Sequence, residues 1–276
     1  MATITTETLL DAPCPRVGIT VEGLGVGDSV VSVWRTADGE RHPVRGARRT
    51  TIVDAGFITD YDAPLERPVT YELEVLSGPS GPDSATSEPV TVPSATAWLM
   101  DPLVPHSAVP VLGTKDSDGS AYFRSEAMAE LEYAADASMI TIMGSDAPMM
   151  LFGQVMKARG IPLAMSTRSA EQNVKLKRLL QSTAQFVFRP IPGHGWDLPG
   201  TMHIGIPSKV ELPVDVSMGG SLTRWDMRAD TVQAPVLKVL TATYTWGDVA
   251  IMFATYQQKQ DAVTGTYLDD LKNPFG

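Results

Sequence analysis

The chain has 276 residues, 43% of them hydrophobic and 20% charged, which is the balance of a globular protein with room for two domains of ordinary size. Its formal net charge of −10 repels phosphate, so the composition argues against binding to nucleic acid or to anionic lipid. The apolar runs fall far short of the roughly 20 residues of a membrane-spanning helix. We therefore expect no membrane insertion.

The first 97 residues are expected to form an arm, residues 1–14, followed by an all-β module, residues 15–97. Apolar and small or polar residues alternate over 17–21, the period of a half-buried strand, and Asp38 followed by Gly39 is typical of a hairpin turn. Further strands are expected at 29–35, 50–54, 70–76 and 88–92. The only cysteine, Cys14, lies between two prolines and is expected to be a buried or semi-buried small apolar residue, since one cysteine forms no intrachain disulfide.

Two segments of this module resemble strands of an immunoglobulin or fibronectin type III domain. Segment 68–75, with Tyr71 at its centre, resembles the tyrosine-containing strand, and 87–92 resembles the last strand. The resemblance implies a β-sandwich for residues 15–97.

Residues 98–240 are expected to form a second, β-rich unit with one helix. Thr167 or Ser169 can cap the helix, and its apolar stripe contains Leu176, Leu179 and Leu180. Strands are expected at 108–112, 121–124, 139–143, 161–166, 186–189, 202–206, 209–216 and 224–230.

Residues 241–276 are expected to form a C-terminal arm. A threonine followed by an aromatic residue recurs in it, and each threonine can cap a short helical turn. The three aromatic residues are Trp246, Tyr256 and Tyr267. Two interpretations stay open: the rings fasten the tail to the body of the protein, or the arm docks on a neighbouring subunit.

The chain contains no recognisable catalytic or metal-binding motif. The histidines His42, His106, His194 and His203 form no HExxH pattern, and no phosphate-binding loop or nucleophile elbow is present. The acidic pair Asp116 and Asp118 reads as a loop, and the pair Asp269 and Asp270 as a solvent-exposed helical turn. We expect no enzymatic activity, no cofactor and no metal.

Methionine is concentrated in the second unit. Its flexible side chain suits an irregular core or a subunit interface, and we favour core packing. The residues concerned are Met139, Met143, Met149, Met150, Met156 and Met165.

The second unit also carries a family resemblance. Segment 98–105, which reads Trp-Leu-Met-Asp-Pro-Leu-Val-Pro, and segments 160–168 and 186–190 are similar in order to minor tail proteins of actinobacterial long-tailed bacteriophages, and the threonine–aromatic repeats resemble their ending. The resemblance is to distal tail (Dit-like) proteins. It implies a β-sandwich or split barrel with a helix, and a ring, commonly a hexamer, at the end of the tail.

In such a ring the partners are further copies of the chain, the tail tube protein, the tail hub protein and the tape measure protein. The protein would be assembled in the host cytoplasm, since its N-terminus lacks the pattern of a signal peptide, and would end in the virion. Large aromatic residues dominate interface energies. We therefore expect subunit contacts at Trp225, Trp246, Tyr256 and Tyr267.

Two other functions compete with assembly. The first is a carbohydrate-binding module that attaches to host cell-surface glycans through Trp34, Tyr61 and Tyr71 of the first module. The second is a hydrolase whose acid–base residues the sequence does not reveal.

Overall fold

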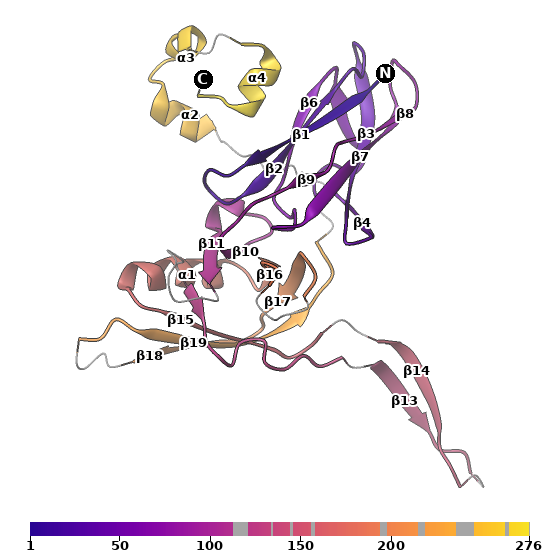
Figure 1. The fold of residues 1–276 in the computed structure, drawn as a ribbon, viewed down its shortest axis with the longest axis vertical. Coiled ribbons are helices and arrows are strands. Elements are labelled where there is room, and N and C mark those ends of the chain that lie inside the picture. Colours follow the sequence, from indigo (N-terminus) through magenta and orange to yellow (C-terminus); the bar gives the residue numbers. More distant parts are fainter. Residues whose placement is uncertain are drawn as a thin grey trace.

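The computed structural model describes residues 1–112, 121–133, 135–143, 146–155, 158–193, 198–214, 219–235, 246–262 and 265–275. The expected mainly β fold is confirmed. An N-terminal sandwich stands on a barrel, a long hairpin projects from the barrel, and a small helical unit lies beside the sandwich (Figure 1). Asp116, Asp118, Met156 and His194, which the sequence singled out, lie outside the described residues.

The sandwich consists of two sheets that share one core. The smaller sheet has the order β1-β2-β6, and the larger has β4-β3-β7-β8, with β5 beside β3 and β9 beside β7. The strands are β1 (Thr3–Leu9), β2 (Arg16–Glu22), β3 (Asp28–Ala37), β4 (Glu40–Pro43), β5 (Thr50–Val53), β6 (Gly56–Asp60), β7 (Pro68–Ser77), β8 (Asp83–Thr86) and β9 (Val90–Thr91). Alternating residues such as Val17, Ile19, Val31, Val33 and Leu73 fill the space between the sheets.

The expectation that residues 1–14 form a separate arm is wrong. Strand β1 pairs with β2 over its whole length, from Thr3 opposite Glu22 to Leu9 opposite Arg16. Ala2 and Ile4 are buried in the sandwich core. The segment is therefore the first strand of the domain, with Ala2 and Ile4 on the face that packs against that core.

A buried charged network ties the two sheets together. Asp60, at the end of β6, accepts hydrogen bonds from Arg35 of β3 at 2.8 and 3.0 Å and from the Tyr71 hydroxyl of β7 at 3.0 Å. Burial by itself would raise the pKa of Asp60, but the Arg35 guanidinium outweighs it and holds that pKa below its usual range. Burial and the neighbouring Asp60 carboxylate raise the pKa of Tyr71.

The second unit contains a closed seven-stranded barrel. Its strands follow each other in the order β15-β12-β11-β10-β16-β17-β19, and β19 pairs with β15 to close the ring. The barrel strands are β10 (Ala97–Met100), β11 (Val109–Leu112), β12 (Ala121–Phe123), β15 (Ile161–Thr167), β16 (Gln185–Arg189), β17 (Met202–Gly205) and β19 (Thr223–Thr231). Strand β18 (Lys209–Pro213) lies outside the ring and pairs with β19.

One helix of ordinary length covers the barrel, as the sequence predicted. Helix α1 (Ala170–Ser182) begins at Ser169, whose hydroxyl accepts the Gln172 N–H at 3.2 Å. Leu176, Leu179 and Leu180 pack into the barrel core. A short 3-10 turn, η1 (Pro105–Ser107), joins β10 to β11.

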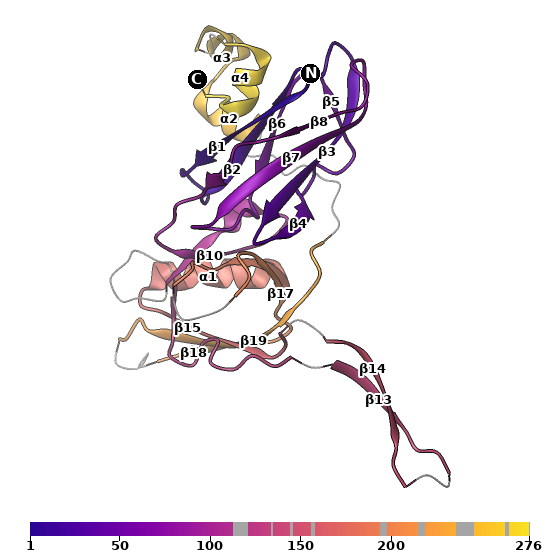
Figure 2. The same ribbon diagram turned by 45° about the vertical axis from the view of Figure 1, so that its right-hand side comes forward.

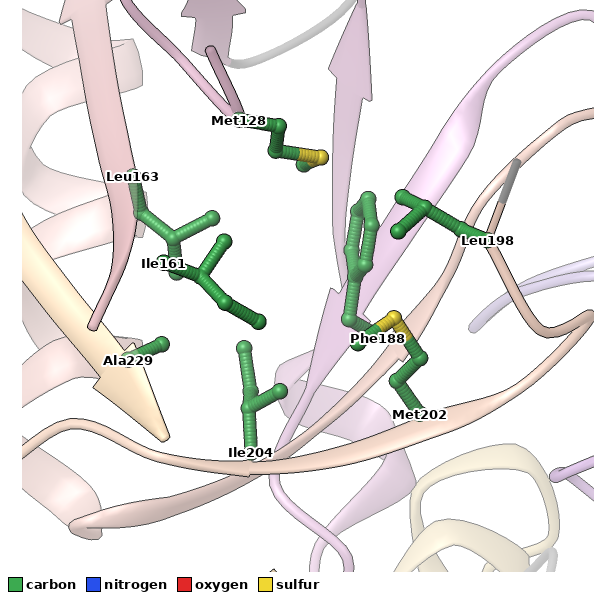
Figure 3. Close-up of a pocket in the computed structure, with 8 residues that line it drawn as sticks. All are labelled: Met128, Ile161, Leu163, Phe188, Leu198, Met202, Ile204 and Ala229. Carbon is green, nitrogen blue, oxygen red and sulfur yellow. The ribbon is translucent and has the colours of Figure 1, made fainter. Parts of the chain in front are cut away.

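The barrel core is filled by its own side chains (Figure 3). One small pocket lies inside the barrel, and the residues that line it are Met128, Ile161, Leu163, Phe188, Leu198, Met202, Ile204 and Ala229. They leave a cavity of about 10 Å³, close to the minimum for a single water molecule. This pocket is therefore packed interior and has no room for a ligand.

The sandwich and the barrel meet at a buried junction. Arg189, at the end of β16, donates from Nε to the Ala63 carbonyl at 2.7 Å and from Nη1 to the Pro15 carbonyl at 2.6 Å. Beside it, Cys14 and Tyr61 of the sandwich pack with Met100 and Val187 of the barrel. The prediction that Cys14 is buried is confirmed.

The remaining elements lie outside both cores. Strands β13 (Ala135–Ile140) and β14 (Met149–Val155) form the projecting hairpin, and α2 (Trp246–Met252), α3 (Tyr256–Ala262) and α4 (Tyr267–Lys272) form the helical unit, in which α4 lies against β6. Among the described residues, no helix is both long enough and apolar enough to span a membrane.

Replacing Asp60 with Asn should lower the free energy of unfolding by about 3–5 kcal/mol, because Arg35 stays buried without its carboxylate partner. Since the folded-state pKa of Asp60 is lowered, the carboxylate stabilises the fold above its unfolded pKa of about 3.9 and loses this effect as the pH falls further. Urea titrations should therefore show the gap between wild type and variant narrowing below about pH 4. The double variant Arg35→Met/Asp60→Leu should recover much of the lost unfolding free energy, because it leaves no buried charge unpaired. If D60N were as stable as wild type at pH 7, the network would not stabilise the fold.

Candidate assembly surfaces

The β13–β14 hairpin extends away from the barrel as a separate two-stranded ribbon (Figure 2). The chain leaves the barrel after β12 and returns at β15, and at the base of the hairpin the Arg159 N–H donates to the Glu132 carbonyl at 2.8 Å. Within the ribbon, Met139 lies opposite Met150 and Ile140 lies opposite Met149. In the described part of the chain, neither strand has a second partner strand.

Both faces of this ribbon are apolar and exposed. Met139, Met150 and Phe152 share one face, with 64%, 45% and 70% of their surface exposed. Ile140, Met149 and Leu151 occupy the other face and are about as exposed, and Met143 near the tip is fully exposed. Asp146 is the only charged residue from 137 to 155.

Such a ribbon is not a stable surface for a free protein. An antiparallel sheet ordinarily keeps one polar face toward water, and a hairpin with unpaired edges invites the addition of another strand. Large exposed apolar patches mark interaction sites. The hairpin is therefore the strongest candidate for an assembly element, and we call it the hairpin arm.

The prediction of core packing is wrong for most of the clustered methionines. Met139, Met143, Met149 and Met150 lie exposed on the hairpin arm, whereas Met165 on β15 is fully buried in the barrel. Their apolar character predicts burial, but it does not distinguish burial by the chain itself from burial by a partner.

Trp225 is not available for subunit contacts, so its prediction as an interface residue is wrong. On β19 inward and outward residues alternate, and Trp225 faces inward with 4% of its surface exposed. Its indole Nε1 donates to Asn173 Oδ1 of α1 at 3.0 Å. The residue fastens the helix to the barrel.

The C-terminal helical unit exposes the other three aromatic residues named from the sequence. Trp246, Tyr256 and Tyr267 are 73%, 73% and 77% exposed, so they do not fasten the tail to the body of the protein. The unit is held internally by Lys259, whose Nζ lies 2.7 Å from Asp270 and 5.4 Å from the centre of the Trp246 ring. The open aromatic rings favour the docking interpretation.

Thr255 and Thr266 cap short helices, as predicted from the sequence. Thr266 begins α4, and its hydroxyl accepts the Asp269 N–H while the Asp269 carboxylate accepts the Thr266 N–H. The Thr255 hydroxyl accepts the Gln258 N–H at 3.3 Å. Thr245 lies outside the described residues. Asp269 therefore has a structural role at the start of α4.

The aromatic residues of the sandwich do not form a platform for a sugar ring. Tyr61 and Tyr71 are buried. The Trp34 ring is covered by the Arg41 guanidinium at 4.1 Å, and its Nε1 donates to Glu74 at 3.0 Å. The residues on which the carbohydrate hypothesis rested are thus all engaged within the domain.

His42 and His203 lie in different environments. His42 pairs with Glu40 on the surface at 3.0 Å, and burial lowers the pKa of His203. Over the described ranges, no group of three or more histidine, cysteine or acidic residues could hold a metal ion. The sequence matches no protein-family model and no curated protein.

In the unassembled chain, replacing Met139 with Thr should leave the unfolding free energy almost unchanged, because the side chain is exposed to water there and Thr suits a strand. Replacing the buried Met165 with Thr, the matched control, should cost about 2–5 kcal/mol. Denaturant titrations compare the two variants. Binding of an apolar fluorescent dye should fall only for Met139→Thr. If Met139→Thr instead lost as much stability as Met165→Thr, the hairpin arm would be packed within the protein.

Proposed function

We propose that this protein is a structural virion protein that forms a ring at the distal end of a bacteriophage tail. The observation that carries the proposal is the hairpin arm, with two apolar faces and two unpaired strand edges on an otherwise well-packed body. A protein that keeps such an element exposed is built to be covered by a partner.

The segments that resemble distal tail proteins lie together in the structure, which supports the phage assignment. Segment 98–105 contains most of β10, segment 160–168 contains β15, and segment 186–190 contains most of β16. Strands β10 and β16 are hydrogen-bonded neighbours, and β15 belongs to the same ring. The barrel would then be the ring-forming domain.

The sandwich supports the second part of the resemblance. Three strands face a larger sheet in which β3 and β7 are central, and this arrangement favours a domain of the immunoglobulin or fibronectin type III class. It would decorate the ring formed by the barrels. The tail tube, hub and tape measure proteins are the neighbours that this position implies.

The proposal is tested by the mass and shape of the full chain in solution. Light scattering and negative-stain imaging should show a closed ring, with six subunits as the expected number. The variant Met139→Lys/Phe152→Lys, called the hairpin variant, should remain a folded monomer of 29.7 kDa because it places two charges on one face of the arm.

The matched control is Val26→Lys/Val53→Lys, which adds the same charges at exposed apolar positions of the sandwich and should still assemble. A wild-type protein that remains monomeric at the highest attainable concentration would overturn the proposal. Equal assembly of the hairpin variant would show that the arm is not the assembly element.

A further inference from the structure

Strand β18 presents a free sheet edge on the barrel. Strand β18 pairs with residues 223–227 of β19, on the edge of β19 opposite β15, and in the described part of the chain it has no second partner strand. An edge strand offers a row of unpaired backbone N–H and C=O groups to which another strand can add.

The side chains of β18 divide into an anchored set and an open set. Lys209 donates to the carbonyls of Leu180 and Thr183, and Glu211 accepts from Lys177 at 2.6 Å, so both face α1. Val210 and Leu212 point the opposite way and are 46% and 43% exposed. The strand is thus held firmly on one side and apolar on the other.

The hairpin arm and β18 lie at opposite ends of the barrel in both views (Figures 1 and 2). The arm of one molecule therefore points away from its own β18. Two different surfaces at opposite ends of one subunit are what a head-to-tail interface requires, and such an interface forms a ring when its rotation closes.

We infer that the hairpin arm of one copy adds to the β18 edge of the next copy. The occupant of the edge is a second copy of this chain, because the arm supplies free strand edges and apolar side chains on both of its faces. Strand β14 has seven residues and β18 has five, so the whole edge can be paired. Backbone hydrogen bonds would join the sheets, and Val210 and Leu212 would be covered by one face of the arm.

A lipid surface fits these observations less well. The net charge of −10 repels anionic membranes, and a bilayer would cover the arm but leave the β18 edge open. The inference rests on the proposed function, since it names the surface that receives the arm during assembly.

The test uses the full chain and a second variant, Val210→Lys/Leu212→Lys, called the edge variant. Alone, the edge variant and the hairpin variant should each be monomeric, because each lacks one of the two surfaces. Mixed in equal amounts, they should form a 1:1 dimer of twice the 29.7 kDa mass, since one intact arm still meets one intact edge. The sandwich control Val26→Lys/Val53→Lys should assemble normally.

A disulfide test places the contact directly. Mixing a Phe152→Cys chain with a Leu212→Cys chain under oxidising conditions should give a cross-linked heterodimer, and the native Cys14 does not interfere because it is buried. A Val26→Cys chain in place of Leu212→Cys should give no such product.

The possible failures are distinguishable. If the edge variant forms the same ring as wild type while the hairpin variant is monomeric, the arm docks elsewhere and the inference is wrong, although the proposed function stands. If neither wild type nor the mixture associates, the proposed function fails with it. Binding of wild type and edge variant alike to phosphatidylcholine vesicles, without formation of the mixed dimer, would replace the second copy with a membrane.

Discussion

The pairing of β15 with β19 is the constraint on which the rest of the structure depends. It joins strands separated by the whole helix and three further strands, from Ile161 opposite Ala229 to Thr167 opposite Thr223. Once it forms, seven strands close into one ring, and Met165 and Trp225 face the same interior. Strand β18 pairs with β19 beyond the short contact of β19 with β17, and the chain between β12 and β15 extends outward as the hairpin arm.

The buried junction extends this order to the sandwich. Arg189 lies fully buried and bonds to carbonyls of Ala63 and Pro15, and Thr201 donates to the Asp62 carbonyl at 2.7 Å. A buried guanidinium is costly without partners, and the Ala63 and Pro15 carbonyls offset part of that cost although Nη2 has no hydrogen-bond partner among the described residues. The two domains are thereby fixed to each other, and any assembly built on the barrel would present every sandwich in the same direction.

Much of the fold could be predicted because its signals are local. Alternation located β2 and β7, the serine and the apolar stripe located α1, and Thr266 located the start of α4. Strand β1 was not predicted, because the turn that joins it to its partner strand β2 carries no hairpin signature. Barrel closure leaves no local trace in the sequence, so the expectation of a sandwich or split barrel did not include the pairing of β15 with β19.

The candidate site was predicted only in part. The three aromatic residues of the C-terminal unit are exposed as a docking arm requires, but Trp225 could have been excluded from the alternation of Thr223, Trp225 and Met227 with charged residues on β19. The hairpin arm was hidden for a physical reason. Its methionines are as apolar as the residues of a core. Removing their side chains from water is favourable whether they are buried by the same chain or by another, so the sequence does not distinguish the two cases.

The exposed methionines of the hairpin arm also make it open to oxidation. Met139, Met143, Met149 and Met150 expose their thioethers to solvent, whereas Met100 and Met165 are shielded in the interior. Peroxide would convert the exposed thioethers to sulfoxides, which are polar, without disturbing the packed barrel. A subunit kept under oxidising conditions would then stay folded while its apolar ribbon became hydrophilic, and methionine sulfoxide reductase would restore it.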